Sequence, residues 1–294
     1  MTTPDPAAAT AATDPHPQTG PALVLPARLA PYDWSLYLVT DTEQCAAAGR
    51  TVPQTAAEAV AGGAGIVQIR DKHASDAEVA ALTRDTISAI EATGRSITPV
   101  AASGSGDVPG PDASRAPGAA PGTDTACAAS SDRPVAVFVD DRLEVVKSLR
   151  AEGLDVHVHV GQTDEPVEDV RAALGPEPLV GLSAGTPAEF SVAGSLRDAA
   201  TGAALVDLVG IGPVHDTTTK EGAPAGIGPE RTAALASIAA EMGLPAVAIG
   251  GITADRAHAL RDAPTLGLCV VSAICTADDP RAAAHAIRSS CPAA

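Results

Sequence analysis

Short hydrophobic runs alternate with alanine-rich stretches along the chain from Leu36 to near its end. Runs such as VAVFVD are apolar at nearly every position, a pattern typical of parallel strands that are covered on both faces. The runs are LYLVT (36–40), GIVQIR (65–70), VAVFVD (135–140), VHVHVG (156–161), LVGLSA (179–184), LVDLVGIG (205–212), AVAIGG (246–251) and GLCVVSA (267–273). The pattern therefore predicts eight buried strands.

The segments between these runs carry helix signals. Ser75 and Glu78 form the Ser-x-x-Glu pattern of a capping box, and Thr186 and Glu189 form a second one with Pro187 at the first helical position. Glycines stand where helices are expected to end, at Gly94, Gly153, Gly175 and Gly243. Eight strand-then-helix units in one chain predict an α/β fold, a (β/α)8 TIM barrel, with a doubly wound parallel sheet as the alternative.

Two segments depart from this alternation. Residues 1–33 are rich in Ala, Pro and Thr, so we expect a disordered N-terminal tail ahead of a catalytic barrel domain at 34–294. Residues 101–133 lack periodicity and large apolar side chains, which indicates a flexible, low-complexity insertion before the third strand. Because this insertion follows a helix and precedes a strand, it should lie at the amino-terminal face of the barrel and take no part in catalysis.

Composition narrows the classes of function. The chain has 36 acidic and 19 basic residues, a formal net charge of −17. This balance argues against a nucleic-acid or anionic-membrane surface, and an anionic substrate would need its own cations or a metal ion. The five cysteines show no Cys-x-x-Cys spacing, so neither a disulfide framework nor a zinc site is indicated. With no secretory signal pattern and no membrane-spanning apolar run, we expect a cytoplasmic protein.

Polar and charged residues gather where the predicted strands end. In a TIM barrel the carboxyl ends of the strands surround the active site, so these residues would meet at one rim. They are Gln68, Arg70, Asp71, Lys72, Asp140, Asp141, Gln162, Asp164, Ser183, Thr217, Thr219, Lys220, Gly250, Gly251, Val271 and Ser272. Taken singly, most have an ordinary interpretation, since Asp141 and Asp164 each stand near a helix start where they would serve as N-caps. Taken together, they indicate a ligand site.

The acids of the third and fourth strands suit a particular metal. Asp141 and Asp164 offer oxygen ligands to Mg²⁺, which usually completes its shell with water and substrate phosphate oxygens. Such a metal would let a diphosphate enter this acidic protein. The remaining phosphate charge would be neutralised by Arg70, Lys72 and Lys220.

A second phosphate has its own predicted place across the barrel. The loops after the seventh and eighth strands form a phosphate cradle in many TIM barrels. The corresponding residues here are Gly251, Val271 and Ser272. The strand ends therefore predict two phosphate-bearing ligands.

Seven motifs resemble those of the thiamine-phosphate synthase family, in the family's order and over about residues 34–290 without the insertion. They are QIRDK (68–72), FVDDR (138–142), HVGQTD (159–164), GLSAGT (181–186), GPVHDTTTK (212–220), AIGGI (248–252) and VVSAI (270–274). The resemblance implies a transferase that condenses 4-amino-2-methyl-5-hydroxymethylpyrimidine diphosphate with a thiazole phosphate, giving thiamine phosphate and pyrophosphate. It also implies Mg²⁺ as cofactor, small molecules as partners, and a dissociative substitution in which the diphosphate leaves first.

The resemblance further assigns roles to the residues at matching positions. For the pyrimidine diphosphate it implies Gln68, Ile69, Arg70, Asp71, Lys72, Asp140, Ser183 and Lys220. For the thiazole phosphate it implies Thr217, Thr218, Thr219, Gly251, Val271 and Ser272. The metal ligands would be Asp141 and Asp164, and the catalytic residues would be Arg70, Lys72, Ser183 and Lys220.

Some features of the chain leave alternatives open. Asp140 stands where the family usually has asparagine, which removes an NH₂ donor. A related thiazole tautomerase would use a histidine near the end of strand five, where this chain reads SAGTPAE. A non-catalytic module that binds thiazole or thiamine phosphate is the other alternative, and Asp140 is the feature that favours it. His157 and His159 alternate on the fourth strand and are expected to be neutral, barrel-lining side chains, and a homo-oligomer is left open.

Overall fold

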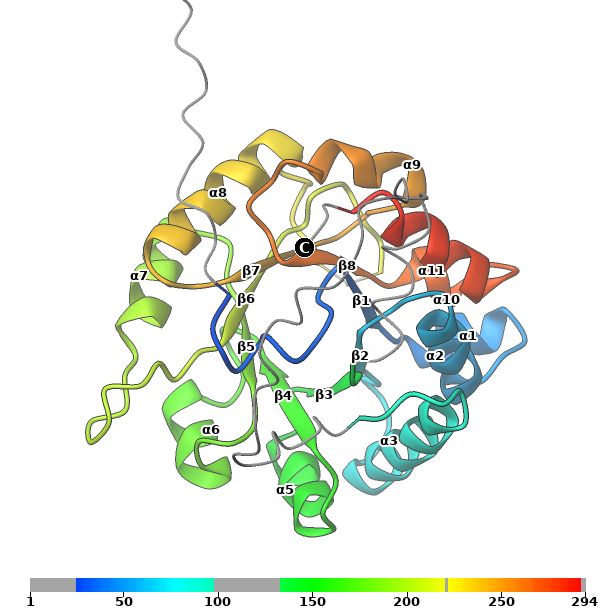
Figure 1. Cartoon of the computed structure of the whole chain (residues 1–294), viewed down its shortest axis with the longest axis horizontal. Coiled ribbons are helices and arrows are strands. Elements are labelled where there is room, and N and C mark those ends of the chain that lie inside the picture. The colour runs from blue at the N-terminus through cyan, green and yellow to red at the C-terminus, as the bar shows by residue number, and fades with distance from the viewer. Residues whose placement is uncertain (1–24, 98–132, 220–221, 292–294) are drawn as a thin grey trace, which may run out of the picture.

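The computed structural model describes residues 25–97, 133–219 and 222–291, in which eight parallel strands form a closed barrel (Figure 1). The strands are β1 (Leu36–Val39), β2 (Ile66–Ile69), β3 (Ala136–Asp140), β4 (Val156–Val160), β5 (Val180–Ser183), β6 (Leu208–Ile211), β7 (Ala246–Ile249) and β8 (Gly267–Val270). Each strand pairs with the next along the chain, and β8 pairs with β1. The predicted (β/α)8 barrel is therefore confirmed, and the closed sheet excludes the doubly wound alternative.

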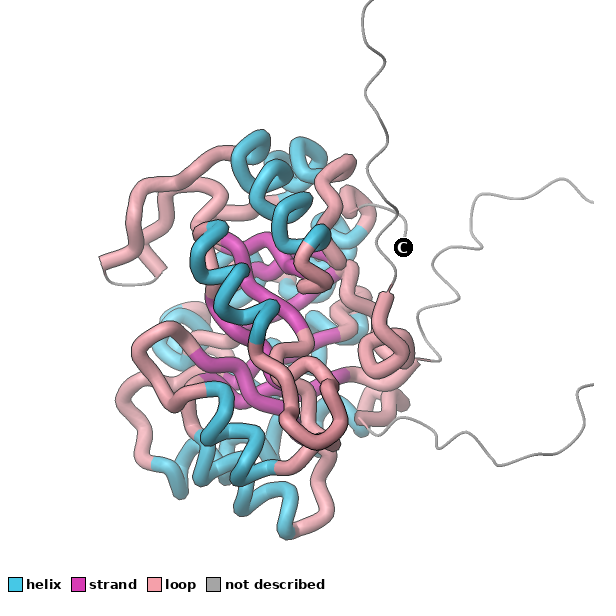
Figure 2. The backbone as a smooth tube through the Cα atoms, turned by 90° about the vertical axis from the view of Figure 1, so that its left-hand side faces the viewer, coloured by secondary structure: helices cyan, strands magenta, loops and turns pink. Residues whose placement is uncertain are grey.

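Helices form a ring around the barrel, as the view along its axis shows (Figure 1), and loops join them to the strands at both ends (Figure 2). The helices are α1 (Thr42–Ala47), α2 (Val52–Ala61), α3 (Asp76–Glu91), α5 (Leu143–Ala151), α6 (Val167–Leu174), α7 (Pro187–Ser195), α8 (Pro229–Glu241), α9 (Ala254–Ala257), the 3₁₀ turn η1 (His258–Leu260), α10 (Ser272–Cys275) and α11 (Pro280–Arg288). None of the helices in the described ranges has the length and apolar character needed to cross a membrane.

The predicted helix signals act as expected. The Ser75 and Thr186 side chains each accept a hydrogen bond from the main chain three residues on, and the glutamate there bonds back, so both capping boxes form. A third box, Thr51 with Gln54, starts α2. The four glycines expected at helix ends all have positive φ, between 73° and 88°. These signals set where each helix begins and ends relative to the strands.

Side chains of each strand alternate between two cores. On β3, Val137 and Val139 belong to the apolar layer between barrel and helices, whereas Ala136 and Phe138 point into the barrel. Asp140 continues the inward series and therefore emerges inside the barrel at its carboxyl end. The same alternation on β2 sends Ile69 outward, since it belongs to the outer layer and is fully buried there. Strand parity thus decides which rim residues reach the interior.

The amino-terminal end of the barrel is closed by residues 25–35, drawn in dark blue across the opening in Figure 1. Leu29, Tyr32 and Trp34 are buried against the inner core, and the Trp34 indole N–H donates to the carbonyl of Leu29 at 2.9 Å. Residues 25–33 of the predicted tail, 1–33, are therefore part of the folded barrel, because their scattered apolar side chains anchor them to it. Residues 1–24 and 98–132, with most of the predicted tail and insertion, lie outside the described residues.

Candidate functional site

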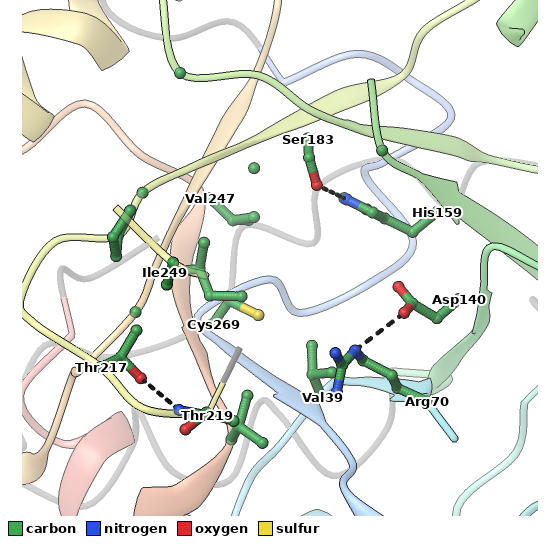
Figure 3. A pocket seen from close by; sticks show the side chains of 18 of the residues that line it. Val39, Arg70, Asp140, His159, Ser183, Thr217, Thr219, Val247, Ile249 and Cys269 are labelled. Carbon is green, nitrogen blue, oxygen red and sulfur yellow. Dashed lines mark hydrogen bonds and ion pairs between the residues drawn. The ribbon is translucent and has the colours of Figure 1, made fainter. Parts of the chain in front are cut away.

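A pocket of about 750 Å³ opens at the carboxyl ends of the strands (Figure 3). It brings together most residues that the sequence predicts for the site. Those lining it are Gln68, Arg70, Lys72, Asp140, Asp141, Gln162, Asp164, Ser183, Thr217, Thr219, Gly250, Gly251, Val271 and Ser272. An adjoining cavity of about 510 Å³ is lined by Asp71 together with Arg70, Lys72, Asp140 and Asp141.

Two predicted residues, Ile69 and Thr218, line neither this pocket nor the adjoining cavity. The side chain of Ile69 points into the outer core, where it has no exposed surface. The side chain of Thr218 is exposed and does not line the pocket, although its neighbours Thr217 and Thr219 do. The prediction for Lys220 falls outside the described residues.

Asp71 shapes the loop that carries Lys72. Burial tends to raise the pKa of the Asp71 carboxyl, but the nearby Thr42 side chain and the hydrogen bonds from the N–H groups of Ala74 and His73 outweigh it and lower the pKa. These two N–H groups donate at 2.9 and 3.0 Å. The Asp71 carboxylate is therefore turned into its own loop, which fixes the path of the chain on either side of Lys72.

A line of hydrogen bonds crosses β1, β2 and β3 at the inner wall of the pocket. The Tyr37 hydroxyl donates to Oε1 of Gln68 at 2.5 Å, and Nε2 of Gln68 donates to Oδ1 of Asp140. The other carboxylate oxygen, Oδ2 of Asp140, lies 3.2 Å from Nε of Arg70. Burial raises the pKa of Tyr37, with Cys269 and Asp140 adding to the effect, so Tyr37 stays a donor. The direction of the whole line is fixed by the Asp140 carboxylate, which can only accept, so the NH₂ group of Gln68 faces Asp140 and its Oε1 faces the Tyr37 hydroxyl.

The Asp141 and Asp164 carboxylates line the same pocket but serve no helix as a cap. Arg142 and Pro166 occupy the N-cap positions of α5 and α6, so the N-cap alternative is wrong for both aspartates. Asp141 has a φ of 57°, a left-handed conformation uncommon outside glycine. Asp164 accepts from the N–H of Gly161 at 2.9 Å.

The described residues contain no group of three or more His, Cys, Asp or Glu side chains that would enclose a metal ion. Two carboxylates at the rim of a pocket fit Mg²⁺, which proteins hold through one or two carboxylates plus water and substrate phosphates. The fit at Asp164 is also steric, because a Cβ atom at position 161 would come within 2.5 Å of the Asp164 carboxylate oxygen. Gly161 thus leaves room for that side chain at the rim.

On the neighbouring strands β4 and β5, the side chains of His159 and Ser183 point toward each other in the pocket (Figure 3). Nε2 of His159 lies 3.1 Å from Oγ of Ser183, and the Gln162 side chain donates to the Ser183 carbonyl at 2.7 Å.

Strand parity places His157 and His159 inside the barrel, as predicted. His157 is buried in the inner core, and burial lowers its pKa to about 4, so it is neutral. His159 belongs to the pocket, a role that its strand position alone did not reveal.

The far side of the pocket is made of hydroxyl, glycine and main-chain groups. The N–H of Thr219 donates to Oγ1 of Thr217 at 3.3 Å, which holds these two side chains next to each other (Figure 3). Gly251 has a φ of 62°, and a Cβ atom there would come within 2.8 Å of the Asp216 carbonyl oxygen. Burial lowers the pKa of the nearby His215, with Arg256 adding to the effect.

Comparison with known proteins agrees with the motifs. The family model for thiamine monophosphate synthase matches residues 36–97 and 123–274. The chain is 33% identical over 259 residues to the thiamine-phosphate synthase of Azorhizobium caulinodans, covering 88% of this chain and 95% of that protein. It is 36% identical over 265 residues to the thiamine-phosphate synthase of Xanthobacter autotrophicus, covering 90% and 98%.

A solved structure confirms the fold independently. The thiamine phosphate pyrophosphorylase from Pyrococcus furiosus has a TM-score of 0.61 and 22% identity, with 89% of this chain and 96% of that chain covered. The barrel, the ordered motifs and the family match lead to one conclusion. The chain belongs to the thiamine monophosphate synthase family.

Proposed function

We propose that the pocket at the carboxyl ends of the strands is where this thiamine-phosphate synthase joins a pyrimidine diphosphate to a thiazole phosphate. The observation that carries the proposal is the division of the pocket into two unlike halves. Cations and carboxylates occupy the ends of β2, β3 and β4. Hydroxyl and glycine residues occupy the loops after β6, β7 and β8. The first half suits a diphosphate with a metal, and the second suits a monophosphate bound mainly by neutral groups.

The pyrimidine diphosphate belongs with the first half. Arg70 and Lys72 offer positive charge to its phosphates, and Gln68 and Ser183 offer hydrogen bonds on the inner wall. His159 holds the Ser183 hydroxyl in place from the side. These residues orient the substrate and stabilise charge that builds up on the diphosphate as it departs.

Asp141 and Asp164 are the residues that would hold Mg²⁺ in this half of the pocket. When bound, the ion supplies positive charge to the diphosphate oxygens, which makes the diphosphate a better leaving group. The two carboxylates would also keep the ion at the rim, so that phosphate oxygens complete its shell.

Thiazole phosphate occupies the second half, with its phosphate against Thr217, Thr219, Gly251 and Ser272. The bond from the pyrimidine methylene carbon to the diphosphate oxygen breaks, and its electron pair leaves with the diphosphate. The lone pair of the thiazole nitrogen then forms the new carbon–nitrogen bond. No side-chain nucleophile is needed, and Cys269, which lines the pocket, stays a thiol because burial raises its pKa.

The tautomerase alternative lacks support at the end of β5. Ser183 is followed there by Ala184, Gly185 and Thr186, with no histidine. The Glu189 carboxylate in this segment already accepts from the N–H groups of Gly185 and Thr186, at 2.7 and 2.9 Å. The matches to thiamine-phosphate synthases favour catalysis over the non-catalytic module as well.

The direct test incubates the purified protein with both substrates and Mg²⁺ and follows thiamine phosphate and pyrophosphate. We expect equal amounts of the two products, and their loss in the Asp141→Ala variant and with a chelator. Asp169→Ala, an exposed aspartate on α6, is the matched control and should retain activity. Full activity in chelator would refute the metal assignment. Binding of both substrates without turnover would refute the synthase and support the binding module.

A further inference from the structure

Arg70 is held between two carboxylates. Its Nε lies 3.2 Å from Oδ2 of Asp140, and its Nη1 lies 3.7 Å from Oδ2 of Asp41. All three side chains are only 15 to 16% exposed, so water screens the pairs weakly. The main-chain N–H of Arg70 also donates to Oγ1 of Thr40 at 3.1 Å. The cation that faces the diphosphate half of the pocket is thus already engaged by the protein.

The Asp140 carboxylate that pairs with Arg70 is itself held in place. Oδ1 of Asp140 accepts from Gln68, which in turn accepts from the buried Tyr37 hydroxyl. Both oxygens of Asp140 therefore have assigned donors, Gln68 on one side and Arg70 on the other. An asparagine here would keep its oxygen toward Gln68 and turn its NH₂ group toward Nε of Arg70, where two donors face each other. Only the carboxylate satisfies both neighbours.

We infer that Asp140 is a positioning residue that holds Arg70 against the inner wall and so limits how tightly the site binds diphosphate. The inference rests on the proposed place of the diphosphate beside Arg70 and Lys72. A phosphate group that approaches Arg70 must compete with Asp140 for the guanidinium, because both anions would pair with the same cation. The same competition acts on pyrophosphate as a product, so Asp140 favours its release.

The test measures pyrophosphate binding by titration calorimetry in chelator, with wild type, Asp140→Asn, Arg70→Gln and the double variant. We expect Asp140→Asn to bind pyrophosphate roughly tenfold more tightly, because Arg70 is then released from its carboxylate partner and pairs more fully with phosphate. Arg70→Gln should weaken binding, and Asp140→Asn should give no gain in the Arg70→Gln background. In steady state with Mg²⁺, Asp140→Asn should lower the KM for the pyrimidine diphosphate and leave the KM for thiazole phosphate unchanged.

Asp155→Asn is the matched control, because Asp155 also pairs with an arginine, Arg150, at 2.9 Å, but stands just before β4 at the other end of the barrel. It removes the same charge and should leave pyrophosphate affinity unchanged. A gain that persists in the Arg70→Gln background would show direct repulsion and overturn the role through Arg70. Unchanged or weaker binding in Asp140→Asn would overturn it as well. If Arg70→Gln itself binds pyrophosphate normally, the proposed place of the diphosphate is wrong, and the inference fails with it.

Discussion

His159 reaches Ser183 because glycines stand on the next two strands of the barrel, β5 and β6. Nε2 of His159 lies 3.1 Å from Oγ of Ser183, and the imidazole ring lies over Gly181 of β5 and Gly210 of β6. A Cβ atom at position 181 would come within 2.4 Å of Nδ1 of His159, whereas one at position 210 would lie 3.6 Å from Cε1. The first distance is a clash and the second is ordinary contact. Space for the ring, and not backbone conformation, is what requires glycine at position 181.

We therefore predict that Gly181→Ala displaces His159 and with it the Ser183 hydroxyl. Its kcat/KM should fall by on the order of 100-fold, the usual effect of a misplacement of about 1 Å in an active site. Overpacking should also lower the free energy of unfolding by about 1 to 3 kcal/mol. In the Gly210→Ala variant the new methyl group faces the same ring at a longer distance. Its kcat/KM and its free energy of unfolding should therefore fall much less. Steady-state kinetics and urea unfolding of the two variants check this, and equal losses would contradict it.

The strand pattern in the sequence was sufficient to predict the barrel and the convergence of the rim residues. Consecutive apolar runs identified all eight strands, and the rule that active sites stand at strand carboxyl ends identified Arg70, Asp140 and Ser183. The contact between Arg70 and Asp140 could not be predicted from the sequence. It depends on the register of β2 against β3, which pairs Ile69 with Val139. Sequence spacing within one strand carries no information about that register.

Three further differences have physical causes that the sequence pattern hides. Ile69 was assigned to the substrate because it lies inside a motif, but strand parity sends its side chain into the outer core. Tyr37 and His159 were not assigned to the site, because buried residues within strands are usually packing residues. The tail boundary was misplaced because Leu29 and Tyr32 are isolated among prolines and alanines, and only the open end of the barrel gives them a place to pack.

The Tyr37 hydroxyl should matter for binding as well as for folding. Tyr37→Phe keeps the ring but leaves Oε1 of Gln68 without its 2.5 Å donor. An unsatisfied buried acceptor costs about 1 to 3 kcal/mol, so the free energy of unfolding should fall by that amount. Gln68 becomes free to turn, and the KM for the pyrimidine diphosphate should rise while that for thiazole phosphate stays constant. Urea unfolding and two-substrate kinetics test this, and a matched rise in both KM values would count against it.

His157 predicts a specific acid sensitivity. Burial lowers its pKa to about 4, so the folded protein keeps it neutral, whereas the unfolded chain protonates it near the ordinary value of about 6.5. Between these values the unfolded state binds a proton that the folded state does not. Stability is therefore unaffected above about pH 7, falls as the pH drops from 6.5 toward 4, and loses roughly 3 kcal/mol in total.

Urea unfolding at several pH values between 7.5 and 4.5 measures this loss. His157→Gln, which has no group that titrates in the window, should show a flatter dependence on pH than the wild type. His73→Gln is the matched control, since it removes an imidazole from a side chain that is 77% exposed. The pKa of Asp33 is lowered from 3.8 despite burial, because Ser35 and Arg288 bind its carboxylate, so its contribution is lost only at lower pH. If the free energy of unfolding of His157→Gln depended on pH as steeply as that of the wild type, His157 would be excluded as the source of the acid sensitivity.

The segment that closes the barrel is held by an ionic cluster around Asp207, just before β6. Oδ1 of Asp207 lies 2.9 Å from Nη1 of Arg28, and Oδ2 lies 2.5 Å from Nη2 of Arg171 and accepts from the N–H of Val180 at 2.7 Å. The Asp207 and Arg171 side chains are 7 and 8% exposed. Burial lowers the pKa of Arg171, although Asp207 opposes this shift. The aspartate is thus the counter-charge for a buried cation.

Asp207→Ala should lower the free energy of unfolding by about 3 to 5 kcal/mol, because Arg171 is then buried without its counter-charge. Glu152→Ala is the matched control, since it breaks an exposed pair with Arg84 and should change stability little. Asp207 lies at the end of the barrel away from the pocket, so the folded fraction of Asp207→Ala should keep its KM values. Urea unfolding and kinetics below the unfolding transition separate the two effects. A loss no larger than that of Glu152→Ala would mean that Arg171 finds other acceptors among the carbonyls it already contacts, such as that of Pro178.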